Sequence, residues 1–140
     1  MNERGTKIQV KFFLAKKFLF LQRGKNMKKF IHSFGFAFSG IFQLLRTERN
    51  FAIQFSAMLL VVLAGFYFSI TISEWLIILS ISALVLTLEA LNSAIEKVCD
   101  LYSTENDSRI KLIKDIAAGA VLISAIFAAI IGIIVFGKYF

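Results

Sequence analysis

The sequence contains no proline, one cysteine and one histidine among 140 residues. Without proline, no helix is interrupted by a pyrrolidine ring. The single cysteine, Cys99, excludes an internal disulfide, and the single histidine, His32, excludes a metal site built from a histidine cluster. A serine nucleophile would also lack its usual histidine base. Neither a glycine-rich Walker sequence nor the protein-kinase signatures occur, so no nucleotide-binding motif of the soluble type is present.

Acidic residues are scarce in the first part of the chain. Residues 1–50 hold 11 Lys and Arg but only 2 Asp and Glu, a net charge of +9, whereas residues 51–140 carry a net charge of −2. A basic segment next to membrane spans favours anionic lipid over nucleic acid as its partner. We therefore expect no nucleic-acid partner.

Apolar residues, by contrast, are abundant. They make up 58% of the chain, and 16 residues are Phe. The usual share in soluble proteins is about 45–50%. Three runs approach the roughly 20 residues that a membrane-spanning helix needs, which disfavours the alternative of a soluble helical bundle. The sequence predicts an all-α membrane protein, with an amphipathic surface helix at about 28–48 and spans at about 51–70, 75–100 and 115–137.

The N-terminal segment 1–26 is basic throughout. Its apolar part is interrupted by Lys16 and Lys17, so a cleavable signal peptide is not predicted. The segment is either an interfacial amphipathic helix or a dispensable extension ahead of a natural start at Met27. Residues 27–140 then form one membrane domain, in which the 28–48 helix is either a simple anchor or the floor of an interfacial site.

The distribution of Lys and Arg predicts the orientation in the membrane. The N-terminal region and the 97–115 segment carry almost all of them, whereas the 69–74 connection carries none. Positive residues favour the cytoplasmic side. We expect the N-terminus and the second loop in the cytoplasm and the C-terminus outside.

A stripe of polar side chains runs along the end of the second span. At about 100° per residue, Glu89, Asn92, Glu96 and Asp100 lie within about 80° of one another around the helix. An acid at mid-membrane costs roughly 2.5–3.5 kcal/mol, so a stripe of this kind requires a partner. Cys99 lies about 80° from Glu89 around the helix and is predicted to serve packing.

Three interpretations of this stripe follow from its chemistry. Carboxylate oxygens suit Mg²⁺ together with substrate phosphates, and Lys114 would suit a phosphate. A carboxylate in the bilayer can act as general base for a hydroxyl, so phosphoryl transfer is one interpretation. A proton or ion pathway and a role in helix assembly are the two others.

A longer pattern identifies a resemblance. Glu89 and Asn92 are followed by Ser-Ala-Ile-Glu96 and then Asp100, and Lys114-Asp115-Ile-Ala-Ala-Gly opens the next span. This order resembles the small bacterial membrane lipid kinases, the prokaryotic diacylglycerol kinase and undecaprenol kinase family, over about residues 28–138. The resemblance implies Mg²⁺-dependent transfer of the γ-phosphate of ATP to the primary hydroxyl of a membrane lipid alcohol. It also implies a multi-pass protein of the bacterial cytoplasmic membrane and a homotrimer with shared active sites.

The resemblance further implies residue roles. Glu89 would be the general base, Asn92 would orient the reacting groups at the lipid substrate, and Glu48 and Glu96 would hold Mg²⁺. The implied ATP contacts are Lys29, Phe36, Glu48, Glu96, Asp100, Glu105, Asp107, Lys114 and Asp115. Lys29 stands where the family often has Arg, Phe36 where it has Tyr, and Glu105-Asn106-Asp107 where Glu-Tyr-His is common. The forms Glu96-Lys97 and Ile116-Ala117-Ala118-Gly119-Ala120 resemble the undecaprenol branch.

Overall fold

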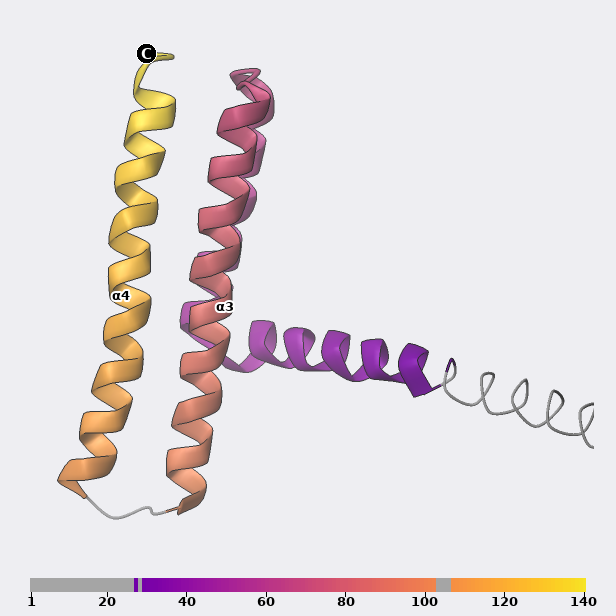
Figure 1. Cartoon of the computed structure of the whole chain (residues 1–140), viewed down its shortest axis with the longest axis vertical. Helices are drawn as coiled ribbons and strands as arrows, with labels where there is room; N and C mark the ends of the chain where they lie inside the picture. The colour runs from indigo at the N-terminus through magenta and orange to yellow at the C-terminus, as the bar shows by residue number, and fades with distance from the viewer. Residues whose placement is uncertain (1–26, 28, 103–106) are drawn as a thin grey trace, which may run out of the picture. The chain divides into compact units, whose positions relative to one another are not determined.

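A computed structural model describes residues 27, 29–102 and 107–140 (Figure 1). These residues are helical apart from short turns, and no strand occurs among them. Their contacts divide the chain into two units, Met1–Phe42 and Gln43–Phe140, which are described separately. The predictions for residues 1–26 fall outside the described residues.

A helix covers residues 29–47. The rings of Phe30 and Phe34, one turn apart, meet edge to face with their centroids 5.1 Å apart. The helix exposes large apolar side chains, which are those of Phe30, Ile31, Phe34, Phe36, Phe38, Ile41 and Phe42. A helix is present over the predicted range, whereas its amphipathic character and its placement on the membrane surface stay predictions.

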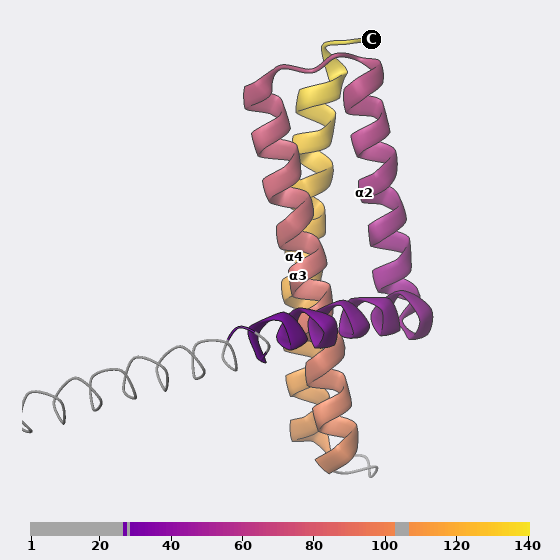
Figure 2. The ribbon, with the colours of Figure 1, turned by 90° about the vertical axis from the view of Figure 1, so that its right-hand side faces the viewer.

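Three long helices form the second unit: α2 (Arg49–Tyr67), α3 (Ile72–Tyr102) and α4 (Ser108–Gly137). Each is long and apolar enough to cross a membrane. Figure 2 shows α2 and α3 side by side with α4 behind them, and α3 packs against both neighbours. The prediction of an all-α protein with three membrane-spanning helices is confirmed.

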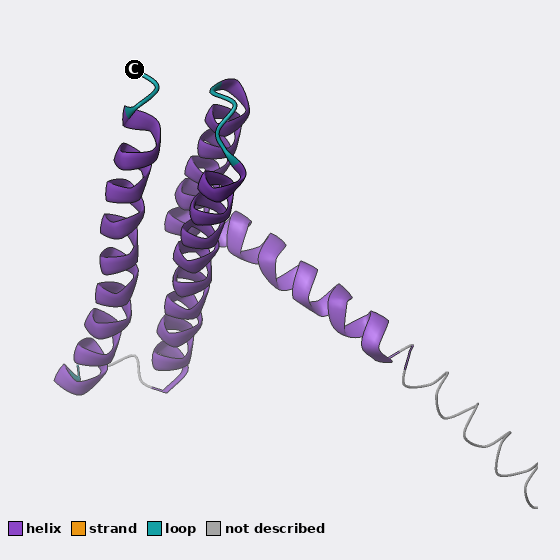
Figure 3. Ribbon diagram, turned by 45° about the horizontal axis from the view of Figure 1, so that its top comes forward, coloured by secondary structure: helices purple, strands orange, loops and turns teal. Residues whose placement is uncertain are grey.

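Helix α4 begins earlier than the expected residue 115. Asp107 is its N-cap, and the Asp107 carboxylate accepts a hydrogen bond of 2.8 Å from the backbone N–H of Arg109. Such a cap satisfies one of the free N–H groups of the first turn. The helix therefore starts in polar sequence and carries Lys111 and Lys114 before its apolar part. Figure 3 shows the short turn between α2 and α3 in teal.

A polar cluster joins the α2–α3 turn to the C-terminal residues, which lie at the same end of the bundle (Figure 1). Glu74 accepts hydrogen bonds from the backbone N–H and the hydroxyl of Thr71, at 2.8 and 2.7 Å. The same carboxylate pairs with Lys138 at 2.5 Å and accepts a 3.0 Å hydrogen bond from the Tyr139 hydroxyl. The hydrogen bond from Lys138 to Glu74 raises the pKa of the Lys138 ammonium. The ring of Phe68 packs beside Tyr139, so the turn holds the C-terminus.

Few side chains in this unit are buried, as expected for helices that face lipid. Several of the buried ones on α3 are polar: Glu89, Asn92 and Ser93. Cys99 is buried as well, which agrees with its predicted packing role. Helix α3 thus buries polar side chains of its second half together with a few apolar ones, Ile78 and Val85 among them.

Gly65 on α2 permits a close approach of the two helices. A Cβ atom at this position would lie 2.7 and 2.9 Å from two carbons of the Trp75 ring and 3.1 Å from Ile70 Cδ1. The indole ring is rigid, so the helices would have to move apart. We expect Gly65→Ala to lower the free energy of unfolding by about 1–3 kcal/mol, measured as thermal unfolding in detergent.

Gly40→Ala is the matched control, because a Cβ at Gly40 meets nothing within 4 Å. The intrinsic helix preference of Ala makes this control neutral or stabilising. Equal unfolding midpoints for wild type and Gly65→Ala would contradict the packing argument.

Candidate functional site

A polar cavity of about 300 Å³ lies between the start of α2 and the second half of α3. Glu48, the N-cap of α2, lines it from one side. Glu89, Asn92 and Glu96 line it from α3, where the helical repeat places them on one face. The structure therefore brings the acid predicted from the first helix together with three members of the predicted stripe.

Glu89 lies deepest among the acids of the cavity, with 3% of the residue exposed. One of its oxygens, Oε2, accepts a 3.3 Å hydrogen bond from Nε2 of Gln54 on α2. A buried carboxylate without a donor is costly, so the amide from α2 stabilises it. This arrangement places a carboxylate with one fixed oxygen inside a membrane helix, as a general base for a lipid hydroxyl would require.

Asn92 and Glu96 form a second amide–carboxylate pair one turn further along α3. Nδ2 of Asn92 donates to Oε1 of Glu96 over 2.8 Å. The carbonyl oxygen Oδ1 of Asn92 is buried and has no hydrogen-bond partner in the described part of the chain. An unpaired buried acceptor of this kind costs about 1–3 kcal/mol, which a ligand would recover.

The donor set around Asn92 fits Mg²⁺. Among the described residues, no group of three or more His, Cys, Asp and Glu side chains is placed to hold a metal by itself. Mg²⁺ does not need one, because it usually binds one or two carboxylates and keeps water and phosphate oxygens as its other ligands. Glu48, Glu96 and the free Oδ1 of Asn92 offer such a partial set at the cavity.

Glu48 also forms an ion pair with Lys97 of α3. The hydrogen bond from the Lys97 ammonium lowers the pKa of the Glu48 carboxyl below its ordinary value. The pair therefore keeps Glu48 ionised, the form that binds a cation. Lys97 follows Glu96 in the sequence but points about 100° away from it around the helix.

A second ion pair connects α3 and α4. Lys114 Nζ lies 2.5 Å from Oδ1 of Asp100, and both side chains are partly exposed. Exposed pairs of this type contribute only about 0–1 kcal/mol, so a phosphate group could replace the carboxylate at Lys114 at little cost. Asp115 is exposed beside Lys114.

Four further residues were predicted to contact the nucleotide, namely Asp107, Glu105, Lys29 and Phe36. Asp107 caps α4 and pairs with Arg109 at 2.7 Å, which lowers the pKa of the Asp107 carboxyl. Glu105 falls outside the described residues. Lys29 and Phe36 belong to the first unit, where both side chains are exposed.

Two residues of the site were not predicted. Gln54 was visible in the sequence as the only strongly polar side chain of its span, but the sequence does not show which helix face it meets. Lys97 lies outside the acidic stripe, and no sequence pattern predicts its contact with Glu48. Both were found only through the packing of α2 against α3.

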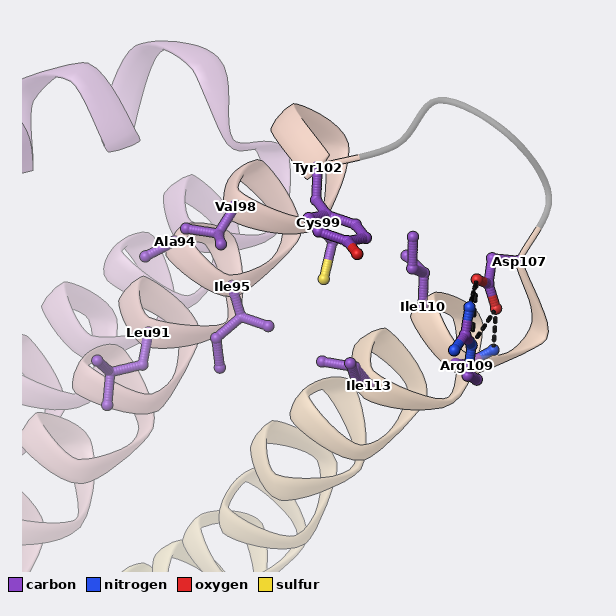
Figure 4. A pocket seen from close by; sticks show the side chains of 10 residues that line it. All are labelled: Leu91, Ala94, Ile95, Val98, Cys99, Tyr102, Asp107, Arg109, Ile110 and Ile113. Carbon is purple, nitrogen blue, oxygen red and sulfur yellow. Dashed lines mark hydrogen bonds and ion pairs between the residues drawn. The ribbon is translucent and has the colours of Figure 1, made fainter.

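An apolar cavity of about 570 Å³ occupies the other side of α3 (Figure 4). Figure 4 shows Leu91 and Ile95 of α3 on one side and Ile113 of α4 on the other, with the Asp107–Arg109 pair near the start of α4. Most of its α3 residues lie on the face opposite Glu89. Helix α3 therefore separates a polar cavity from an apolar one.

The chain resembles known proteins over most of its length. A family model described as prokaryotic diacylglycerol kinase matches residues 35–136. The chain belongs to this family. The match contains every predicted site residue except Lys29. Membership makes the chain a phosphotransferase with an alcohol group as acceptor, and its three apolar helices make it a multi-pass membrane protein.

Two relatives have curated names. The chain is 39% identical to undecaprenol kinase of Bacillus subtilis over 111 residues. The matched region makes up 79% of this chain and 90% of that protein. The chain is also 37% identical to diacylglycerol kinase of Synechocystis sp. over 101 residues. This matched region makes up 71% of this chain and 58% of that protein. The resemblance found in the sequence is confirmed at the level of the family.

The Glu48–Lys97 pair gives a prediction for the acid–base behaviour of the site. Lys97→Met removes the ammonium donor, so the pKa of Glu48 should rise towards its ordinary value. A side-chain ¹³C NMR titration in the presence of a metal chelator measures it. The stability gained from this lowered pKa is present above the unfolded-state pKa and is lost as the pH falls through the folded-state pKa, and Lys97→Met should reduce that loss.

Lys111→Met is the control, because Lys111 is exposed on α4 and the substitution removes the same charge. Its Glu48 titration should match that of wild type. A Glu48 midpoint that does not move in Lys97→Met would contradict the ion pair.

Proposed function

We propose that the protein is an ATP- and Mg²⁺-dependent lipid kinase that transfers the γ-phosphate of ATP to the primary hydroxyl of undecaprenol. The observation that carries the proposal is the polar cavity, which combines a buried carboxylate, Glu89, with two further carboxylates at its other end. Diacylglycerol is the second candidate substrate, because it offers a primary hydroxyl at the same depth. The higher coverage of the relative named undecaprenol kinase favours the first.

In the proposed reaction Glu89 accepts the proton of the lipid hydroxyl. The hydroxyl oxygen forms a bond to the γ-phosphorus, the bond from that phosphorus to the β–γ bridging oxygen breaks, and ADP leaves. No covalent enzyme intermediate is formed. Asn92 orients the reacting groups, and Glu48 and Glu96 hold Mg²⁺, which supplies charge neutralisation for the phosphates. Positioning and charge stabilisation account for most of the catalysis in such transfers.

The other residues predicted to contact ATP are proposed to have the following roles. Lys114 would bind phosphate after leaving Asp100, whose carboxylate then supports the metal and nucleotide site. Asp115 would lie beside them. Lys29, Phe36, Glu105 and Asp107 are proposed as further contacts of the nucleotide. This scheme explains the absence of a soluble nucleotide-binding motif, since charged side chains of membrane helices replace the glycine-rich loop.

We also propose that the chain acts as a homotrimer in the bacterial cytoplasmic membrane. Three helices leave most of their side chains exposed, and the faces of α4 at Gly119 and Gly132 meet nothing within 4 Å. Small residues of this kind allow close helix packing in membranes. The N-terminus and the α3–α4 connection would lie in the cytoplasm, where ATP is available.

The proposal predicts which lipid becomes labelled. The protein in vesicles is given γ-labelled ATP and Mg²⁺ with undecaprenol or with diacylglycerol. We expect label in undecaprenyl phosphate, and label in phosphatidic acid alone would replace the substrate. Ion flux without ATP and no labelled lipid would favour the competing interpretation of a proton or ion pathway.

Glu89→Gln should lower this turnover by about 10²–10⁴-fold, the usual contribution of general acid–base catalysis. The amide keeps the size of the side chain, so oligomer formation and ATP binding should stay intact. Near-normal lipid phosphorylation by Glu89→Gln would remove Glu89 from the role of base.

Glu48→Gln and Glu96→Gln should each raise the Mg²⁺ concentration needed for half-maximal activity by about tenfold or more, because each removes an ionised ligand. A metal titration of lipid phosphorylation measures this shift. Glu74→Gln, the same change at the opposite end of the bundle, is the control and should leave the midpoint unchanged. An unchanged midpoint in both site variants would contradict the ligand assignment.

A further inference from the structure

Gln54 is a polar side chain that the proposed reaction does not yet use. It lies in the apolar part of α2 and contacts the buried base, Glu89. Its Nε2 donates to Oε2 of Glu89 over 3.3 Å, which connects α2 to α3. Its own carbonyl oxygen, Oε1, is buried and has no hydrogen-bond partner within the described residues.

The contacts of Gln54 repeat those of Asn92. Each amide donates its N–H to one carboxylate of the cavity, Gln54 to Glu89 and Asn92 to Glu96. Each then leaves a carbonyl oxygen buried and unpaired. These two are the only buried side-chain polar atoms without a partner among the residues that the structure describes. A purely structural amide would be expected to satisfy both of its ends.

The free oxygen of Gln54 belongs to the same amide that contacts the proposed base, Glu89, and the lipid hydroxyl has to reach this base. An alcohol O–H is a donor, and Gln54 Oε1 is an unused acceptor. The amide N–H holds one oxygen of Glu89 at the same time, which restricts the rotation of the carboxylate. Both effects place the hydroxyl and the base in a defined geometry before the proton moves.

We propose that Gln54 is the positioning residue for Glu89 and supplies a second acceptor for the lipid hydroxyl. Nε2 fixes Oε2 of Glu89, so that the other carboxylate oxygen receives the proton. Oε1 accepts the hydrogen bond of the arriving alcohol beside it. This inference rests on the proposed lipid kinase function, and it adds a contribution from the apolar part of α2, whose start already supplies Glu48 to the site.

Gln54→Met tests the proposal, because Met has a similar length and suits the bilayer but offers no amide. We expect kcat/KM for the lipid to fall about tenfold or more while KM for Mg²⁺-ATP stays within error. The protein should remain folded, with a thermal unfolding midpoint lowered by a few degrees, because one hydrogen bond to a buried carboxylate is lost. Gln54→His should restore part of the loss, because neutral imidazole also combines one N–H donor with one acceptor. Gln43→Met, the same change at an exposed position, is the control.

Infrared spectroscopy tests the contact independently of turnover. The carboxylate stretching band that disappears in Glu89→Gln belongs to Glu89. This band should shift in Gln54→Met, which removes the donor, and should stay in place in Gln43→Met. The shift is expected whichever substrate the enzyme uses, so this measurement remains valid if the proposed function fails.

Two results would overturn the proposal. One is a Glu89 band that is identical in wild type and Gln54→Met. The other is an active wild type whose Gln54→Met variant keeps its lipid kcat/KM within twofold, or loses lipid turnover, Mg²⁺-ATP affinity and stability together. A wild type that labels no lipid alcohol refutes the proposed function instead, and the infrared result then decides the contact alone.

Discussion

The burial of one carboxylate inside a membrane-spanning helix is the constraint on which the second unit depends. Glu89 is almost fully buried in α3, in a part of the chain that would otherwise be apolar. A carboxylate at such a position needs a hydrogen-bond donor, and the donor comes from Gln54 on α2. This contact joins α2 to α3, together with the Glu48–Lys97 ion pair and the packing of Gly65 against Trp75. The start of α2, and with it Glu48, lies at the same cavity.

At the opposite end of the bundle, another carboxylate joins separate segments of the chain. Glu74 gathers Thr71, Lys138 and Tyr139 around one carboxylate and so joins the α2–α3 turn to the C-terminus. Polar contacts therefore join the helices at both ends, while a few apolar side chains, Ile78, Val85 and Val121 among them, are buried between the ends and many others face outward. In a bilayer this is an effective arrangement, because apolar contacts between helices gain little over contacts with lipid.

The proposed site would allow a kinase to work without a soluble nucleotide-binding fold. Phosphoryl transfer depends on placing charges around the phosphates and aligning the attacking hydroxyl. Helix α3 provides a buried acid towards the middle of the bundle and further acids towards its end, and α2 and α4 add Glu48 and Lys114. A lipid alcohol in the membrane and a nucleotide in the water would meet along this line. The membership of the chain in the prokaryotic diacylglycerol kinase family agrees with this division.

The sequence by itself determined the helices and the polar face, because both follow from local periodicity. Apolar runs of sufficient length predicted three spans, and the helical repeat predicted that Glu89, Asn92 and Glu96 share a face. The sequence missed the early start of α4, since the cap at Asp107 lies in polar sequence that carries no apolar pattern. Only the tertiary structure decided the partners of the stripe. Gln54 and Lys97 lie 35 and 49 residues from the acids they contact, and no local pattern encodes which helix faces meet.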